Sequence, residues 1–173
     1  MEEWDVYDVQ RQKLGKTVMR GQELADGEYH LVVHACIFNA NGELLIQQRS
    51  QTKSGWPGMW DLSVGGSALR GETAQEAIAR EMREELGLLV DFSQNRPHLT
   101  IHFDQGFDDL FLLELDVALE DCVLQTEEVA AIRWASRSEI AYLQESGQFI
   151  PYYASLLDLL FDIVGQRGCE QKV

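Results

Sequence analysis

Basic residues are scarce in this sequence, which has 14 Lys and Arg against 29 Asp and Glu and a formal net charge of −15 at pH 7. Contact with a nucleic-acid backbone or an anionic membrane surface requires basic patches, so this balance argues against both kinds of partner. We therefore expect no nucleic acid and no membrane among its partners. A phosphorylated substrate would need a local positive site, which a bound metal ion supplies most naturally.

Cysteines and long apolar runs are also few. Cys36, Cys122 and Cys169 form an odd set without the spacing of a metal site, which predicts reduced thiols in a cytosolic protein. No apolar run approaches the ~18 residues that a membrane-spanning helix needs. No leading basic-then-apolar segment resembles a signal peptide. We therefore expect a soluble, cytoplasmic protein.

The length of 173 residues, with 45% hydrophobic residues, suits one domain with a sizeable core and is short for two. There are no internal repeats or low-complexity segments. We therefore predict a single domain over 1–173, in which 1–28 is a polar N-terminal extension. Within this extension, alternating apolar residues predict one edge strand, at Trp4, Tyr7 and Val9.

Patterns of β-branched, aromatic and turn residues predict strands along the rest of the chain. Asn41-Gly42 marks a hairpin turn and Gly106 marks another. The predicted strands are 29–38, 43–48, 59–64, 88–92, 99–103, 108–119 and a short one within 126–134. Helices are predicted at 74–86, at 138–145 with Ser138 as its cap, and at 151–164. One mixed sheet with helices on both faces buries these elements most simply.

The segment 66–88 (GSALRGETAQEAIAREMREELGL) carries the helix predicted at about 74–86. Thr73 and Glu76 have the form of a capping box, and Gly87 suits the left-handed position that ends a helix. The apolar face follows the 3.6-residue period of a packed helix. It consists of Ala74, Ala77, Ile78 and Met82.

Carboxylates interrupt this apolar face. At about 100° per residue, Glu81 and Glu85 project among the core residues, while Glu84 lies on the flank. The pair lies at the negative end of the helix dipole, and like charges four residues apart destabilise a helix. A divalent cation would reconcile these features, because clustered carboxylates supply the oxygen ligands that it prefers. A solvated acidic face is the alternative, which the inward orientation disfavours.

The same segment resembles the signature of the Nudix hydrolases, with every position of the signature present. The matching residues are Gly66, Glu72, Arg80, Glu81, Met82, Glu84, Glu85, Gly87 and Leu88. The resemblance covers roughly 29–145 and implies an α/β fold, the Nudix α/β/α sandwich with a mixed β-sheet flanked by helices. It also implies a pyrophosphohydrolase that uses Mg²⁺, with Mn²⁺ as an alternative.

The resemblance assigns roles within this Nudix box. Glu81 and Glu85 would be metal ligands, Glu84 would bind a further metal ion or its water, and the carbonyl of Gly65 would complete the shell. Arg80 lies away from Glu81 on the helix and is expected to bond Glu72 and fix its loop. A surface ion pair is the alternative role for Arg80.

The general base is left open by the sequence. It must reach the attacking water, and family members draw it from different places. Glu84 is one candidate. Glu127 and Glu128, in a loop after the predicted sheet, are the others, although two acids in a loop are usually only solvated.

A second resemblance, along 30–66, is to the isopentenyl-diphosphate isomerase branch of the same superfamily. That branch uses a cysteine at the position of Gly65 and a metal-binding histidine at the position of Ser67. Only His30 remains at a matching ligand position, and a lone histidine in a strand is more often structural. The missing groups favour hydrolysis over isomerisation.

We therefore predict metal-dependent hydrolysis of a diphosphate linkage in a nucleoside di- or triphosphate or a related derivative. Arg49 and Lys53 are the predicted phosphate contacts, and Trp60 is a predicted stacking residue. An isomerase-like enzyme and a non-catalytic ligand-binding module remain as alternatives. The sequence leaves open the substrate, the number of metal ions and whether the chain forms a homodimer.

Overall fold

The computed structural model describes residues 2–166, 168 and 170, so the prediction for Cys169 lies outside the described residues. Cys36 is fully buried, and Cys122 is a free thiol. The contacts divide the chain into two compact units. The first comprises Met1–Ala35 with Val64–Phe111, and the second comprises Cys36–Ser63 with Leu112–Val173.

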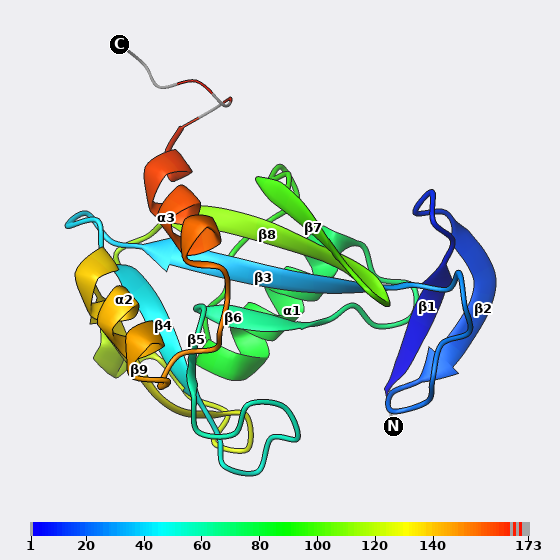
Figure 1. Cartoon of the computed structure of the whole chain (residues 1–173), viewed down its shortest axis with the longest axis horizontal. Helices are drawn as coiled ribbons and strands as arrows, with labels where there is room; N and C mark the ends of the chain where they lie inside the picture. The colour runs from blue at the N-terminus through cyan, green and yellow to red at the C-terminus, as the bar shows by residue number, and fades with distance from the viewer. Residues whose placement is uncertain (1, 167, 169, 171–173) are drawn as a thin grey trace. The chain divides into compact units, whose positions relative to one another are not determined.

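The first unit holds a hairpin, strands that pair with β3, and the long helix (Figure 1). β1 and β2 pair with each other, the first half of β3 pairs with β6, and β7 pairs with β8, all antiparallel. The bounds are β1 Glu3–Tyr7, β2 Lys13–Met19, β3 His30–Phe38, β6 Val64–Ser67, α1 Ala74–Leu86, β7 Leu99–Phe103 and β8 Gly106–Glu114. β3 and β8 each end in the second unit.

The second unit is built on the antiparallel pair β4–β9, which runs from Leu44 opposite Ala135 to Arg49 opposite Val129. Two helices, α2 and α3, contact each other in this unit. The bounds are β4 Leu44–Arg49, β5 Trp60–Asp61, η1 Leu119–Asp121, β9 Val129–Ala135, α2 Arg137–Glu145 and α3 Ala154–Ile163.

The main sheet has the strand order β5-β4-β3-β8-β7, with β6 paired to β3 and β9 paired to β4. Trp60 and Phe149 add a parallel bridge to the antiparallel ladders. The predicted α/β class, a mixed sheet with flanking helices, is confirmed. Among the described residues no helix is long and apolar enough to cross a membrane.

Helix α1 anchors its unit through the predicted apolar face. Ala77, Ile78 and Met82 are fully buried. Each large apolar side chain that leaves water stabilises the fold by about 1.5–3 kcal/mol. In the second unit, Leu44, Leu45 and Ile46 of β4 form a continuous buried run, which explains why the alternation expected of a half-exposed strand is absent there.

The prediction of one strand over 59–64 is wrong, because this segment contains β5 and the start of β6 with a break between them. At the break, the carboxylate of Asp61 accepts from the N–H of Leu62 at 2.8 Å, and the hydroxyl of Ser63 donates to the carbonyl of Leu45 at 2.5 Å. Hydrogen bonds to side chains therefore take the place of the backbone hydrogen bonds that a continuous strand would make here. As a consequence, Gly65 and Gly66 lie inside β6 and not after a strand.

Other boundaries also differ from the predictions. No strand forms at 88–92, where Leu89 is exposed and Phe92 is buried against Phe111. Gly106 begins β8 and is not the turn, and β8 ends at Glu114 and not at 119. β2 was not predicted, because its residues are mostly polar and exposed and are held by pairing with β1.

The cap of α2 is Ser136, not Ser138. The hydroxyl of Ser136 accepts from the N–H of Glu139, and the carboxylate of Glu139 accepts from the N–H of Ser136 at 2.8 Å, which completes a capping box. Two serines lie within three residues here. Only the one with extended backbone, at φ −72° and ψ 162°, can serve as the cap.

We predict that Ser136→Ala lowers the free energy of unfolding by about 1 kcal/mol, because it removes the capping hydroxyl. Ser138→Ala, two residues away, is the matched control and should have a smaller effect. Urea denaturation followed by circular dichroism measures both. A larger loss in Ser138→Ala would contradict the assigned cap.

Candidate active site

Helix α1 starts and ends where the sequence predicts. Thr73 is the N-cap, its hydroxyl accepts from the N–H of Glu76, and the Glu76 carboxylate accepts from the N–H of Thr73. Gly87 ends the helix with a left-handed backbone at φ 72°. These local devices set the rotation of the helix, and therefore the direction in which its carboxylates point.

Two of the predicted metal ligands pack against β6, with Glu85 buried and the Glu81 side chain 13% exposed. Glu85 is 4% exposed, and its carboxylate accepts from the N–H of Gly65 at 3.3 Å. The carboxylate of Glu81 lies so close to Gly66 that a Cβ there would be 2.0 Å from its Oε1. Glu84 is different, because 42% of its side chain is exposed. Two carboxylates thus meet the backbone of two consecutive glycines.

Arg80 links these carboxylates to the loop before the helix. Its Nε donates to Glu72 at 2.7 Å, which confirms the predicted pair, and a second nitrogen donates to the carbonyl of Ser67 at 3.0 Å. The prediction that Arg80 lies away from Glu81 is wrong, since its guanidinium donates to Glu81 at 2.8 Å and to Glu84 at 3.1 Å. Only 14% of the Arg80 side chain is exposed, so this is not a surface ion pair.

The electrostatics of the buried pair follow from this arrangement. Burial raises the pKa of Glu81, and the guanidinium of Arg80 opposes that shift. Burial lowers the pKa of Arg80 itself, but the Glu72 carboxylate and Glu81 more than reverse the effect, so Arg80 stays charged. Arg80 therefore supplies the positive charge that the acidic cluster needs in the absence of another cation.

The donor chemistry at Glu81 and Glu85 fits a divalent cation, because buried carboxylate oxygens beside an open backbone are typical ligands of Mg²⁺ and similar ions. In the part of the chain that the structure describes, no three His, Cys, Asp or Glu side chains already stand together as a ligand cluster. Arg80 holds both Glu81 and Glu84. A cation would therefore compete with Arg80 for these two carboxylates.

His34 and Asp108 adjoin the site and were not singled out from the sequence. His34 stands opposite Gly65 in the sheet, and its Nδ1 lies 2.8 Å from Asp108. A Cβ on Gly65 would lie 2.2 Å and 2.4 Å from two atoms of the His34 ring. Alternation along β3 could have revealed His34, because it shares a face with His30 four residues earlier.

The ring of His30 packs against other aromatic rings. Its ring stacks on Trp4 with centroids 4.5 Å apart and meets Phe103 edge-on. Burial lowers its pKa to about 4, which keeps it neutral at pH 7. Its Nδ1 is buried and has no hydrogen-bond partner among the described residues. These contacts favour the structural role that the sequence suggested for a lone strand histidine.

The predicted substrate contacts belong to the second unit, where each already has a partner. Arg49 donates to the carbonyl of Gly55 at 2.9 Å and pairs with Asp61 at 3.2 Å. Lys53 pairs with Glu128, one of the candidate bases. The ring of Trp60 lies under the guanidinium of Arg133, 5.1 Å away. The other candidate base of the loop, Glu127, accepts a bond from Thr52 through its backbone carbonyl.

Comparison with known proteins shows the family of this chain. The NUDIX domain family model matches residues 28–155, and the chain belongs to the Nudix hydrolase family. An uncharacterized Nudix hydrolase of Listeria monocytogenes is 51% identical over 163 residues, which are 94% of this chain and 95% of that protein. The chain is accordingly an enzyme of the Nudix hydrolase class.

Two further relatives bear on the fold and on the second resemblance. A crystal structure of a Deinococcus radiodurans protein superposes with a TM-score of 0.72 at 25% identity, covering 92% of this chain and 97% of that one. An isopentenyl-diphosphate Delta-isomerase of Salmonella heidelberg is 36% identical over 111 residues, 61% of each protein. The predicted likeness to the isomerase branch is therefore real but partial.

We predict that Gly65→Ala lowers the free energy of unfolding by about 2 kcal/mol, because the new methyl group overlaps the His34 ring that Asp108 holds. In a His34→Ala background, Gly65→Ala should lower the free energy of unfolding by much less. Urea denaturation of the wild type, both single variants and the double variant gives the coupling. An equal loss of free energy of unfolding in both backgrounds would show that the His34 ring is not what excludes a side chain at position 65.

The raised pKa of Glu81 predicts a pH-dependent stability in metal-free protein. The native state holds the Glu81 proton more tightly than the unfolded chain does. Stability from this group is therefore lost as pH rises from the ordinary pKa of 4.5 to the raised native value. The free energy of unfolding of Glu81→Gln, relative to wild type, should increase across that interval.

The measurement is urea denaturation in EDTA at a series of pH values from about 4 to 7. Glu84→Gln is the matched control, since it removes the same charge from a more exposed position of the helix. A difference between Glu81→Gln and wild type that does not change with pH would contradict the prediction.

Proposed function

We propose that this enzyme hydrolyses a diphosphate linkage in a nucleoside di- or triphosphate or a related nucleoside diphosphate derivative. Mg²⁺ is the proposed metal, with Mn²⁺ able to replace it. The observation that carries the proposal is the burial of Glu81 and Glu85 against the two glycines of β6. Membership of the Nudix family supports divalent-cation use and a small-molecule substrate in general.

The proposed ligands are Glu81, Glu85 and Glu84 with the backbone carbonyl of Gly65. When bound, a divalent cation supplies positive charge for the phosphoryl oxygens, whose negative charge spreads as the anhydride is cleaved. Arg80 keeps the loop of Glu72 in place through its two bonds to that carboxylate, at 2.7 Å and 3.0 Å. Its proposed role is therefore to position the ligand carboxylates.

Substrate binding is proposed for Arg49, Lys53 and Trp60. Arg49 would offer a guanidinium that Asp61 already orients, and a guanidinium in a fixed direction suits bidentate contact with phosphate. The proposed base remains one of Glu84, Glu127 and Glu128. The pH dependence of kcat in the three single Gln variants would identify it, because only loss of the base removes the acidic limb.

Metal binding supplies the first test. Mg²⁺ or Mn²⁺ should raise the Tm of the wild type, because a ligand that binds only the native state stabilises it. Glu85→Gln should abolish most of this rise. The matched control is Glu145→Gln, which removes one carboxylate from the exposed face of α2 and should behave like wild type. The same metal response in Glu85→Gln and Glu145→Gln would place the metal elsewhere.

Turnover supplies the second test. Glu85→Gln should lower kcat at least about a hundredfold, because the lost ligand contributes several kcal/mol to the transition state. Phosphate release is measured with Mg²⁺ on nucleotides, nucleotide sugars and dinucleotides. Isopentenyl diphosphate belongs in the same panel, because of the isomerase relative, and should yield no dimethylallyl diphosphate. Efficient formation of that product without any nucleotide hydrolysis would overturn the proposed function.

A further inference from the structure

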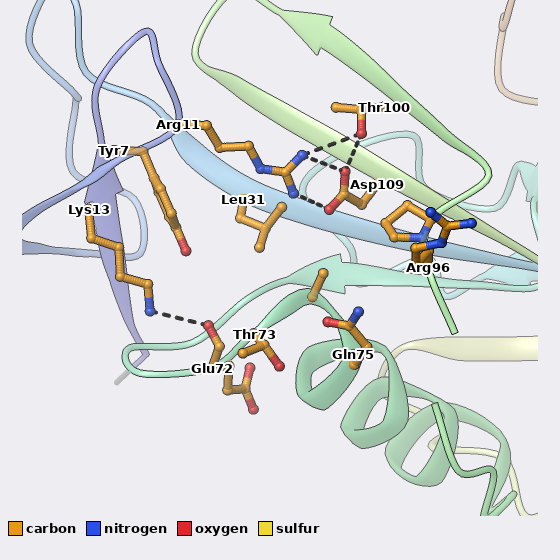
Figure 2. Close-up of a pocket in the computed structure, with 12 residues that line it drawn as sticks. Tyr7, Arg11, Lys13, Leu31, Glu72, Thr73, Gln75, Arg96, Thr100 and Asp109 are labelled. Atoms are coloured by element: carbon orange, nitrogen blue, oxygen red, sulfur yellow. Dashed lines mark hydrogen bonds and ion pairs between the residues drawn. The ribbon is translucent and has the colours of Figure 1, made fainter. Parts of the chain in front are cut away.

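A cavity of about 500 Å³ lies in the first unit beside the start of α1 (Figure 2). Cavities of this size hold small organic molecules in other proteins. Tyr7, Arg11 and Lys13 of the N-terminal extension line it from one side. The Nudix family model begins only at residue 28, so these three side chains come from outside the matched domain. The cavity is thus partly built by a segment that the family match does not include.

Three basic side chains line this cavity. Arg11 and Lys13 come from the β1–β2 hairpin and Arg96 from the loop before β7 (Figure 2), in a chain that has only 14 basic residues. Two acidic residues, Glu72 and Asp109, also line it. Both carboxylates are already engaged, Glu72 by Arg80 and Asp109 by Arg11. Arg96 is exposed and makes no hydrogen bond or ion pair within the described residues.

The guanidinium of Arg11 is held in place by hydrogen bonds to Asp109 and Thr100. Both terminal nitrogens of its guanidinium donate to Asp109, which is fully buried, and one of them also donates to Thr100 at 3.3 Å. These bonds use three of the five N–H groups of the guanidinium, which leaves two for a ligand. Arg11 also has a left-handed backbone, at φ 62°, a conformation that costs energy in a residue with a side chain.

Lys13 is held in a similar way. Its ammonium pairs with Asp5 at 2.6 Å, donates to the carbonyl of Glu72 at 3.3 Å and lies near the ring of Tyr7. Leu31, Ala74 and Pro97 give the cavity an apolar part. A lining that combines fixed cations with apolar surface suits a molecule that carries a phosphate group on an organic body.

We propose that this cavity binds a phosphate-bearing small molecule, through Arg11, Lys13 and Arg96, at a site whose lining includes the start of the Nudix box but none of the proposed metal ligands. The proposal does not depend on the proposed function. Lys13 contacts the carbonyl of Glu72, and the carboxylate of Glu72 bonds Arg80. Glu72 therefore connects Lys13 of the cavity with Arg80, the residue that bonds Glu81 and Glu84.

The test is calorimetric titration of metal-free protein, in EDTA, with AMP, with inorganic phosphate and with adenosine. AMP and phosphate should bind and adenosine should not. Arg96→Gln should weaken binding about tenfold, because one charge-assisted hydrogen bond is lost. Lys13→Gln should act in the same direction. Arg20→Gln is the matched control, since it removes a half-exposed arginine that pairs with Glu2 away from the cavity lining.

The outcomes separate the two sites and the two sources of phosphate. Glu85→Gln should keep the binding, since Glu85 does not line the cavity. Tighter binding of AMP than of phosphate identifies an organic phosphate as the ligand, and equal binding identifies inorganic phosphate. No saturable binding of either compound to the wild type overturns the proposal. So does an affinity that falls equally in Arg96→Gln and Arg20→Gln, or that Glu85→Gln abolishes.

Discussion

The first unit depends on one arrangement, the packing of two helix carboxylates against a glycine strand. Glu81 and Glu85 of α1 occupy the surface that would otherwise pack on β6, where Gly66 makes room for Glu81 and the N–H of Gly65 donates to Glu85. Buried ionised groups are costly unless they are paired. Arg80 meets part of that cost by pairing with Glu81, so the metal-free helix is held to its loop by the same residue that neutralises the site.

This arrangement places carboxylates where an ordinary helix would have apolar side chains. A helix with an ordinary apolar face would pack more firmly, but it would present no oxygen ligands. The raised pKa of Glu81 is the measurable sign of that compromise. The proposed cation would use carboxylates that Arg80 already holds, so we expect binding of the metal to be linked to release of Arg80 from Glu81.

The N-terminal extension contributes more than a polar tail. Its hairpin, β1–β2, is joined to the rest of its unit by the buried Arg11–Asp109 pair and by the bond from Lys13 to Glu72. The bonded groups lie far apart in the sequence, at positions 11 and 109 and at 13 and 72. This is how a short exposed strand such as β2 remains ordered, and how cationic side chains come to line a cavity in an acidic protein.

The sequence alone determined the features that follow from local periodicity and spacing. The bounds of α1, its two caps, the inward direction of Glu81 and Glu85 and the Arg80–Glu72 pair all arise within 23 consecutive residues, 66–88. Only the tertiary structure decided the contacts between distant segments. These contacts depend on which strands pair and on the conformations of long side chains. They include His34 beside Gly65, Arg80 against Glu81, the break before β6 and the basic cavity. Neighbouring residues do not encode these choices, because such contacts are set by packing and charge across the fold.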